Sequence, residues 1–158
     1  MHKLTLHSIE AELLGVLVHH GVRFVVVGGY AVIFHGHLRA AKDLDLFVDQ
    51  AGDSPARIVA ALQSFRLTVP GFTAEWLAEG KRQLPIPRTI AELLTWIEGV
   101  DFAEAWDGAV PAQVNGLQVR VLSRNHLIRC KRAALLIRDD PQDRADLAAL
   151  DRLSREQA

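Results

Sequence analysis

Two apolar runs predict the centre of a β-sheet. Residues 22–27 are almost all β-branched or aromatic, which is typical of a strand covered on both faces. From Asp43 to Leu46 polar and apolar residues alternate, so a second strand is expected over residues 44–48, with Asp43 and Asp45 on one face. Further strands are expected over residues 91–97, 110–114 and 117–122.

Helical periodicity and capping residues predict helices around these strands. Ser8 is expected to cap the first helix, Ser123 to cap the first of two C-terminal helices, and Pro141 to start the second. The Asn115-Gly116 dipeptide predicts a tight turn between the last two strands. Apart from one short helix, residues 66–88 are expected to be loop, because they contain several Pro and Gly residues. The predicted helices span residues 8–20, 30–35, 54–65, 73–79, 124–137 and 141–155.

Together these elements predict an α/β fold, in which a mixed β-sheet is flanked by helices and a helical pair occupies about residues 124–155. A chain of 158 residues fits one domain, so we expect a single unit over residues 1–158. The formal net charge of −1 argues against a protein whose whole surface binds nucleic acid. The single cysteine, Cys130, favours a reducing compartment, and no apolar stretch is long enough to span a bilayer, so we expect a cytoplasmic protein.

A glycine pair and an aspartate pair carry the predicted chemistry. Gly28 and Gly29 follow the first strand, where backbone N–H groups can approach a phosphate without β-carbons in the way. Asp43 and Asp45 are two residues apart on a strand and project side by side, with about 7 Å between their α-carbons. Adjacent carboxylates repel unless a cation lies between them, and such oxygen ligands suit Mg²⁺ or Mn²⁺. A metal site beside a phosphate site indicates phosphoryl or nucleotidyl transfer.

The order and spacing of these motifs resemble the polymerase-beta nucleotidyltransferase superfamily. In that superfamily a Gly-Gly or Gly-Ser turn precedes a strand that carries Asp-x-Asp or Asp-x-Glu. The chain is most similar to small bacterial members related to toxin–antitoxin and phage-defence nucleotidyltransferases, from about Val22 to Leu150. The residues that match their pattern are Gly28, Gly29, Ala31, His35, Gly36, Arg39, Asp43 and Asp45. The resemblance implies a nucleotidyltransferase-like fold, with nucleotide-binding roles for Gly28, Gly29, Arg39 and Lys131 and a place for His35 in the pocket.

A third carboxylate is also implied by the resemblance, because the superfamily uses one on a later strand. Glu92 occupies the position where most relatives have Asp. On its strand it shares a face with Leu94 and Trp96, where a carboxylate without a cation would be unfavourable. Asp101 is the alternative, and Glu92 as an ordinary exposed strand residue is a third. The leading assignment takes Asp43, Asp45 and Glu92 as metal ligands and catalytic carboxylates.

Charged residues also fall on the apolar faces of the last two helices. Lys131 lies on the apolar stripe of one helix, and Asp143 and Asp146 lie on that of the other. Since an isolated buried charge is costly, we expect an ion pair between Lys131 and one of these aspartates. The functional alternative is that Lys131 faces the triphosphate. The basic run from Arg120 to Arg132 is either a solvated face or a surface for an RNA acceptor. The residues expected in the core include Trp76, Trp96 and Trp106.

The leading hypothesis is transfer of a nucleoside monophosphate from an NTP to an acceptor hydroxyl on RNA, protein or a small molecule. The rival hypothesis is a catalytically weak or inactive binding protein of the antitoxin kind, whose partner would be a cognate toxin or antitoxin protein. The rival is favoured by two departures from the family pattern, at Ala40-Ala41 and at residues 135–140, which look like an insertion. A metal-dependent phosphohydrolase is less favoured, because the Gly-Gly turn would then have no role.

Overall fold

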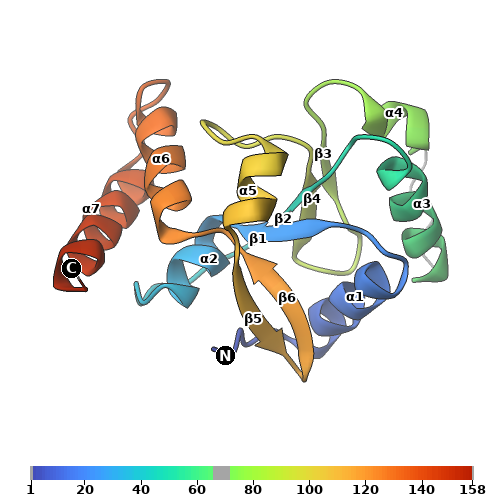
Figure 1. The fold of residues 1–158 in the computed structure, drawn as a ribbon, viewed down its shortest axis with the longest axis horizontal. Helices are drawn as coiled ribbons and strands as arrows, with labels where there is room; N and C mark the ends of the chain where they lie inside the picture. Colours follow the sequence, from blue (N-terminus) through green and yellow to red (C-terminus); the bar gives the residue numbers. More distant parts are fainter. Residues whose placement is uncertain (1, 66–71, 158) are drawn as a thin grey trace.

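A six-stranded sheet forms the centre of the protein, and the computed structural model describes residues 2–65 and 72–157. The strands are β1 (Phe24–Val27), β2 (Leu44–Val48), β3 (Gln83–Pro85), β4 (Ala91–Leu94), β5 (Val110–Val114) and β6 (Leu117–Val121). The helices are α1 (Ser8–His19), α2 (Gly28–Phe34), α3 (Ser54–Ser64), α4 (Ala74–Ala78), α5 (Phe102–Gly108), α6 (Arg124–Leu135) and α7 (Pro141–Glu156). The strand order is β3-β4-β2-β1-β6-β5, with parallel and antiparallel neighbours. The predicted α/β class, with a mixed sheet flanked by helices and a C-terminal helical pair, is therefore confirmed (Figure 1).

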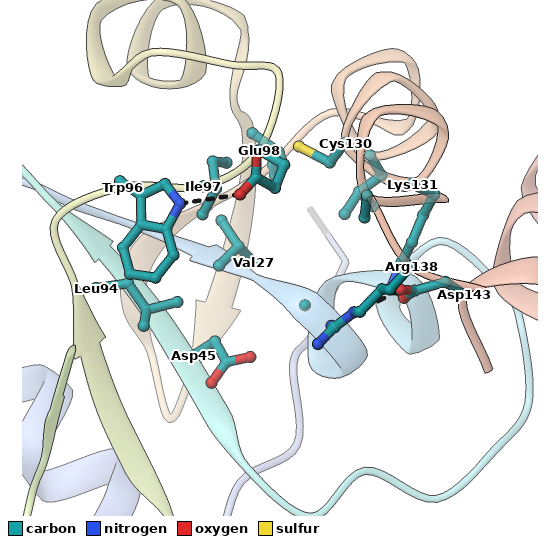
Figure 2. A pocket seen from close by; sticks show the side chains of 14 residues that line it. Val27, Asp45, Leu94, Trp96, Ile97, Glu98, Cys130, Lys131, Arg138 and Asp143 are labelled. Atoms are coloured by element: carbon teal, nitrogen blue, oxygen red, sulfur yellow. Dashed lines mark hydrogen bonds and ion pairs between the residues drawn. The ribbon is translucent and has the colours of Figure 1, made fainter. Parts of the chain in front are cut away.

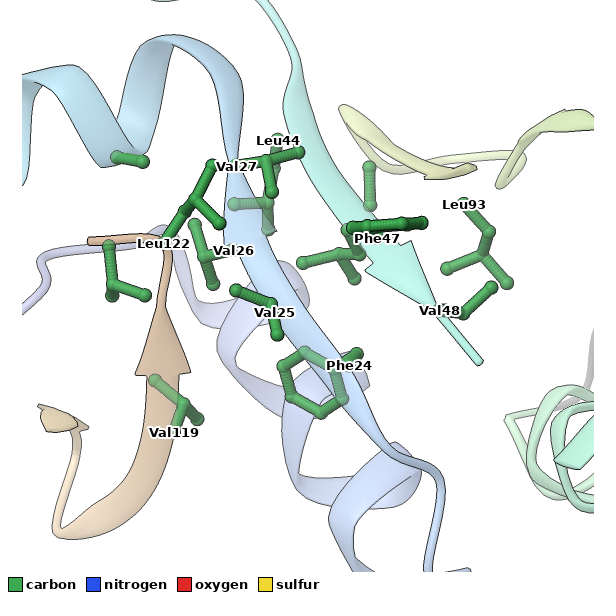
Figure 3. Packing of buried hydrophobic residues seen from close by; sticks show 14 of the residues in the cluster. Phe24, Val25, Val26, Val27, Leu44, Phe47, Val48, Leu93, Val119 and Leu122 are labelled. Atoms are coloured by element: carbon green, nitrogen blue, oxygen red, sulfur yellow. The ribbon is translucent and has the colours of Figure 1, made fainter. Parts of the chain in front are cut away.

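The middle strand, β1, anchors the core. All of its side chains are buried, as expected for a strand covered on both faces. It pairs antiparallel with β2 and parallel with β6, and Phe24 and Val25 pack in the same apolar cluster as Phe47 and Val119 (Figure 3). Each such aliphatic or aromatic side chain stabilises the fold by about 1.5 to 3 kcal/mol when fully buried. A slip of one residue in β2 would carry Asp45 onto the face where Leu44 and Leu46 are buried, so burial favours the observed register between β1 and β2.

That register positions an acidic side chain at the end of β1. Val27, the last residue of β1, is opposite Asp45, and Asp45 is in turn opposite Glu92 on the parallel strand β4. Gly28 follows Val27 directly as the first residue of α2. One edge of the sheet therefore brings together the start of α2, the beginning of β2 and the beginning of β4.

Helices gather on two sides of the sheet (Figure 1). α3 packs against α1 and α4, whereas α6 and α7 pack against each other, with α6 also touching α2. The side chain of Ser123 caps α6 by accepting the N–H of His126, as predicted. Pro141 begins α7, and Asp140 caps it by accepting the N–H groups of Gln142 and Asp143.

Three predicted boundaries were wrong. Ser8 does not cap α1 but is its first residue, and His7 holds the cap position without a side-chain hydrogen bond. α2 starts at Gly28 and not at Tyr30. The strand expected over residues 91–97 ends at Leu94, because the Thr95 hydroxyl accepts the Arg82 N–H and donates to the Gly80 carbonyl, which bends the chain there.

Two short elements were not predicted. β3 contains Pro85, which an edge strand tolerates, and its single buried side chain, Leu84, provides little periodicity. α5 starts after Asp101, whose carboxylate caps it by accepting the N–H of Glu104. Residues 66–71, part of the stretch expected to be loop, lie outside the described residues. Within residues 2–65 and 72–157, no helix is both long and apolar enough to cross a membrane.

Candidate active site

The predicted glycine and aspartate motifs meet at the end of β1. Gly28 has φ +65°, a conformation that favours glycine, and a β-carbon there would lie 2.5 Å from Oδ2 of Asp45. The missing side chain of Gly28 therefore lets the Asp45 carboxylate lie against the backbone at the start of α2. Asp43 precedes β2 and is exposed, whereas Asp45 is half-buried.

A third carboxylate comes from the neighbouring strand. Because β2 and β4 are parallel and Asp45 is opposite Glu92, the two side chains emerge on the same face of adjacent strands, which lie about 4.8 Å apart. Glu92 Oε2 accepts a hydrogen bond of 2.7 Å from Nε2 of Gln83. We refer to Asp43, Asp45 and Glu92 as the β2–β4 carboxylates. Asp101, the alternative third carboxylate, is occupied as the cap of α5.

Burial and two acidic neighbours make Asp45 costly to ionise. Burial raises the pKa of Asp45 to about 6, with Glu92 and then Asp43 adding to the rise, while Lys131 opposes it. None of the ion pairs found among the described residues includes any of the β2–β4 carboxylates. The negative charge at this edge of the sheet is therefore not balanced by a direct contact within that part of the chain.

The donor chemistry of this edge suits a hard divalent cation. Mg²⁺ and Mn²⁺ take one or two protein carboxylates and complete their coordination with water and phosphate oxygens. The side chains do not yet form a finished shell, because within the described ranges no three His, Cys, Asp or Glu side chains are arranged to hold a metal ion. The β2–β4 carboxylates therefore offer oxygen ligands to a cation and leave coordination positions open for a substrate.

The second glycine has a packing role. A β-carbon on Gly29 would lie 3.0 Å from the β-carbon of Ala41 and 3.0 Å from Nη2 of Arg39. A side chain at this position would therefore push against the loop between α2 and β2. A larger residue at Gly29 is therefore expected to lower stability, and a phosphate-binding role for Gly29 stays a prediction.

Lys131 and Arg39, the two predicted nucleotide-binding cations, converge on acids of α7. Lys131 Nζ lies 2.8 Å from Asp143 Oδ1 and 3.0 Å from Asp146 Oδ2, which confirms the predicted ion pair. Arg39 Nε lies 2.9 Å from Asp146 Oδ1, so the fully buried Asp146 has two cationic partners. Although burial works to raise it, the hydrogen bonds and charges of Lys131 and Arg39 hold the pKa of Asp146 below its ordinary value. We call Arg39, Lys131, Asp143 and Asp146 the α6–α7 charge network.

A pocket of about 210 Å³ connects this network to the β2–β4 carboxylates. Asp45 lies at one end of it and Lys131 lies on the α6 wall (Figure 2), and Gly28 is also among the lining residues. The opposite wall is the segment after β4, which contributes Trp96, Ile97 and Glu98 (Figure 2). The remaining lining residues are Val27, Leu94, Leu122, Leu127, Cys130, Ala134, Arg138 and Asp143.

Two residues lie elsewhere in the structure than the sequence predicted. Trp96, expected in the core, is a pocket wall, because the strand that was expected to continue through it ends at Leu94. His35, expected in the pocket, instead makes a hydrogen bond of 2.7 Å between its Nε2 and the carbonyl oxygen of Leu122. Burial lowers the pKa of His35, so its neutral ring fastens α2 to the end of β6.

The basic run on β6 and α6 is paired within the protein. Arg120 donates to the carbonyl of Trp106 and Arg124 to that of Leu153, while Arg129 pairs with Glu104 and Arg132 with Asp151. These contacts agree with a solvated face held by local partners.

A scan against protein-family models finds no match to this chain, and a search of curated proteins finds no similar sequence.

Proposed function

We propose that this protein transfers a nucleoside monophosphate from an NTP to an acceptor hydroxyl, with Mg²⁺ or Mn²⁺ bound by Asp45 together with Asp43 and Glu92. The observation that carries the proposal is the uncompensated charge of the β2–β4 carboxylates beside Gly28, where burial and repulsion raise the pKa of Asp45 to about 6. Repulsion between the carboxylates is unfavourable in the free protein, and a divalent cation that binds between them removes it. The sequence resemblance to polymerase-beta nucleotidyltransferases supports the same reaction.

In the proposed reaction the acceptor oxygen forms a bond to the α-phosphorus, and the bond to the bridging oxygen of the β-phosphate breaks, releasing pyrophosphate. The acceptor proton passes to one of the β2–β4 carboxylates, which act as the general base. The bound metal ion would supply charge stabilisation for the phosphate oxygens. Lys131 lines the pocket beside Asp45, so it is placed to contact the triphosphate while Asp143 and Asp146 orient its ammonium group.

A transfer assay tests this proposal directly. Purified protein is incubated with each α-labelled NTP, Mg²⁺ or Mn²⁺, and a total cell extract as the source of acceptors. We expect label to appear on a macromolecular or small-molecule acceptor with the wild-type protein and to be lost with Asp43→Asn and Asp45→Asn. Asp107→Asn is the matched control, because Asp107 is exposed on α5 and away from the pocket. Equal labelling by wild type and both site variants would remove the β2–β4 carboxylates from the reaction.

The second candidate is a protein that binds a partner without turnover. It is favoured by the α6–α7 charge network, in which the cations expected to hold phosphate already have acidic partners inside the protein. The transfer assay separates the two candidates, since a binding protein would leave every NTP unconsumed with every extract and either metal.

A further inference from the structure

The pocket beside the β2–β4 carboxylates has a mainly apolar interior with one acidic acceptor at its far side. Leu94, Ile97 and Leu127 are among its walls, together with the flat indole of Trp96. Sites for whole ligands in proteins are commonly about 300 to 1,000 Å³. At about 210 Å³, this pocket has room for a ring system but not for a complete NTP. With the phosphates at Asp45, which lines one end of the pocket, the nucleoside end of the substrate reaches toward the other lining residues.

The acidic acceptor is Glu98. Its Oε1 accepts a hydrogen bond of 3.3 Å from Nε1 of Trp96, which orients the carboxylate (Figure 2). No ion pair among the described residues includes Glu98, so no cation there competes for its remaining lone pairs. Across the pocket stands Cys130, whose thiol pKa burial raises to about 12, with Glu98 contributing to the rise. The Cys130 thiol is therefore uncharged near neutral pH, and the charged groups of the α6 side are Lys131 and Arg138, which pair with Asp143.

An oriented carboxylate discriminates among nucleobases by the donors on their Watson–Crick edges. Guanine presents two adjacent donors there, N1–H and the N2 amino group, which match the two oxygens or two lone pairs of a carboxylate. Adenine and cytosine present one amino group next to a bare ring nitrogen, and that acceptor would face the negative charge. Uracil presents one N–H between two carbonyl oxygens. A carboxylate in an apolar pocket thus favours guanine and penalises the other three bases.

We propose that this pocket holds the base of the nucleotide and that Glu98 selects guanine, with Trp96 fixing the Glu98 carboxylate and forming the wall along which the base lies. This inference rests on the proposed nucleotidyl transfer, because it takes the triphosphate to be at the β2–β4 carboxylates. It assigns the substrate class as guanosine nucleotides.

The test measures binding by titration calorimetry in Mg²⁺, with the non-transferable α,β-methylene analogues of GTP, ITP and ATP. The GTP analogue is expected to bind at least about tenfold more tightly than the ATP analogue, since its hydrogen bonds reach a charged acceptor. The ITP analogue, which lacks the N2 amino group, should fall between them. These three affinities use only the wild-type protein, so they test the inference even if a Glu98 variant folds poorly.

Glu98→Gln then tests the residue itself. The amide keeps the shape but replaces one acceptor with a donor, so the GTP analogue should lose about tenfold in affinity while the ATP analogue changes by less than about twofold. Glu12→Gln is the control, because Glu12 is an exposed glutamate on α1 that makes the same charge change outside the pocket.

Each outcome has one meaning. If no analogue binds, both the proposed function and the guanine selection are overturned. If the analogues bind equally and Glu98→Gln changes none of them, guanine selection is overturned while nucleotide binding stands. If Glu98→Gln weakens all analogues alike, Glu98 only shapes the pocket and does not read the base, which also overturns the inference.

Discussion

The α6–α7 charge network and the β2–β4 carboxylates are linked by one pocket, but the pKa of their central aspartates is shifted in opposite directions. In the α6–α7 charge network, Asp146 is fully buried and is held by Lys131 and Arg39, which keep its pKa low. Among the β2–β4 carboxylates, Asp45 is half-buried beside two further acids, and its pKa is raised to about 6. The ion pairs of Asp146 hold α7 against α6 and the loop that carries Arg39. Asp45, which has no ion-pair partner within residues 2–65 and 72–157, costs folding free energy when it ionises.

The network should be broken most severely at Lys131. Among the described residues, Lys131→Met leaves Asp143 with the exposed Arg138, 3.9 Å away, as its one cationic partner, whereas Asp146 keeps Arg39. Breaking a buried pair by removing one partner costs about 3 to 5 kcal/mol, and we expect a loss on this scale in urea denaturation.

A double-mutant cycle shows which aspartate depends on Lys131. Adding Asp143→Leu to Lys131→Met should recover much of the loss, because no charge then remains unpaired there. Adding Asp146→Leu should not recover the loss, because Arg39 would then lose its ion-pair partner. Additive losses for Lys131 and Asp143 would contradict direct pairing.

Asp45→Asn should have the opposite sign in the metal-free protein. The folded pKa of Asp45 lies above the unfolded value, so ionising it costs stability as pH rises from about 4 to about 6. We expect the variant to be more stable than wild type by up to about 3 kcal/mol at pH 8, and equal to it below about pH 4.

Thermal melts across this pH range, with Asp146→Asn in parallel, check the contrast. The pKa of Asp146 is lowered, so its contribution is present above the unfolded pKa and is lost as pH falls through the folded one. Asp146→Asn should therefore be the less stable variant at pH 8. Saturating Mg²⁺ should stabilise wild type and not Asp45→Asn; stabilisation of both alike would argue against metal at Asp45.

Gly28→Ala tests the contact between the turn and the carboxylate. The new β-carbon would meet Asp45 Oδ2 at 2.5 Å and would sit at a φ of +65°, so we expect a loss of about 2 kcal/mol. In an Asp45→Ala background only the backbone penalty of about 1 kcal/mol should remain. Equal losses in both backgrounds, measured by chemical denaturation, would show that Asp45 does not press on this turn.

Glu92→Gln should produce the smallest of these effects on energy but a selective one. If Glu92 acts as a metal ligand or base, turnover should fall about tenfold or more while NTP affinity stays nearly constant, because such a group matters chiefly in the transition state. Steady-state kinetics and calorimetry on the same preparation separate the two quantities. Gln83→Ala, which removes only the hydrogen bond to Glu92, is the control. A parallel fall in affinity would make Glu92 a part of ground-state binding.

Local pattern was enough to predict much of this molecule. The apolar run before Gly28, the Asp-x-Asp alternation, the Asn115-Gly116 turn and the cap at Ser123 all depend on neighbours within a few residues, and each is found where it was expected. The pairing of Lys131 with acids of the last helix was also predicted, because charges on apolar faces require partners. Register then followed from burial, which brought Asp45 opposite both Val27 and Glu92.

The tertiary structure alone decided where the pocket lies and what lines it. At the bend after Leu94, the Thr95 hydroxyl makes hydrogen bonds with Arg82 and Gly80, in the segment before β3, which periodicity did not reveal. Beyond this bend Trp96, expected in the core, is a wall of the pocket. Beyond the same bend Glu98 lines one pocket together with residues of α6, although the β5–β6 hairpin lies between these segments in the sequence. Sequence by itself determined the elements and the acidic pair, because those are local; the structure decided which charges are compensated, because compensation depends on which elements meet in space.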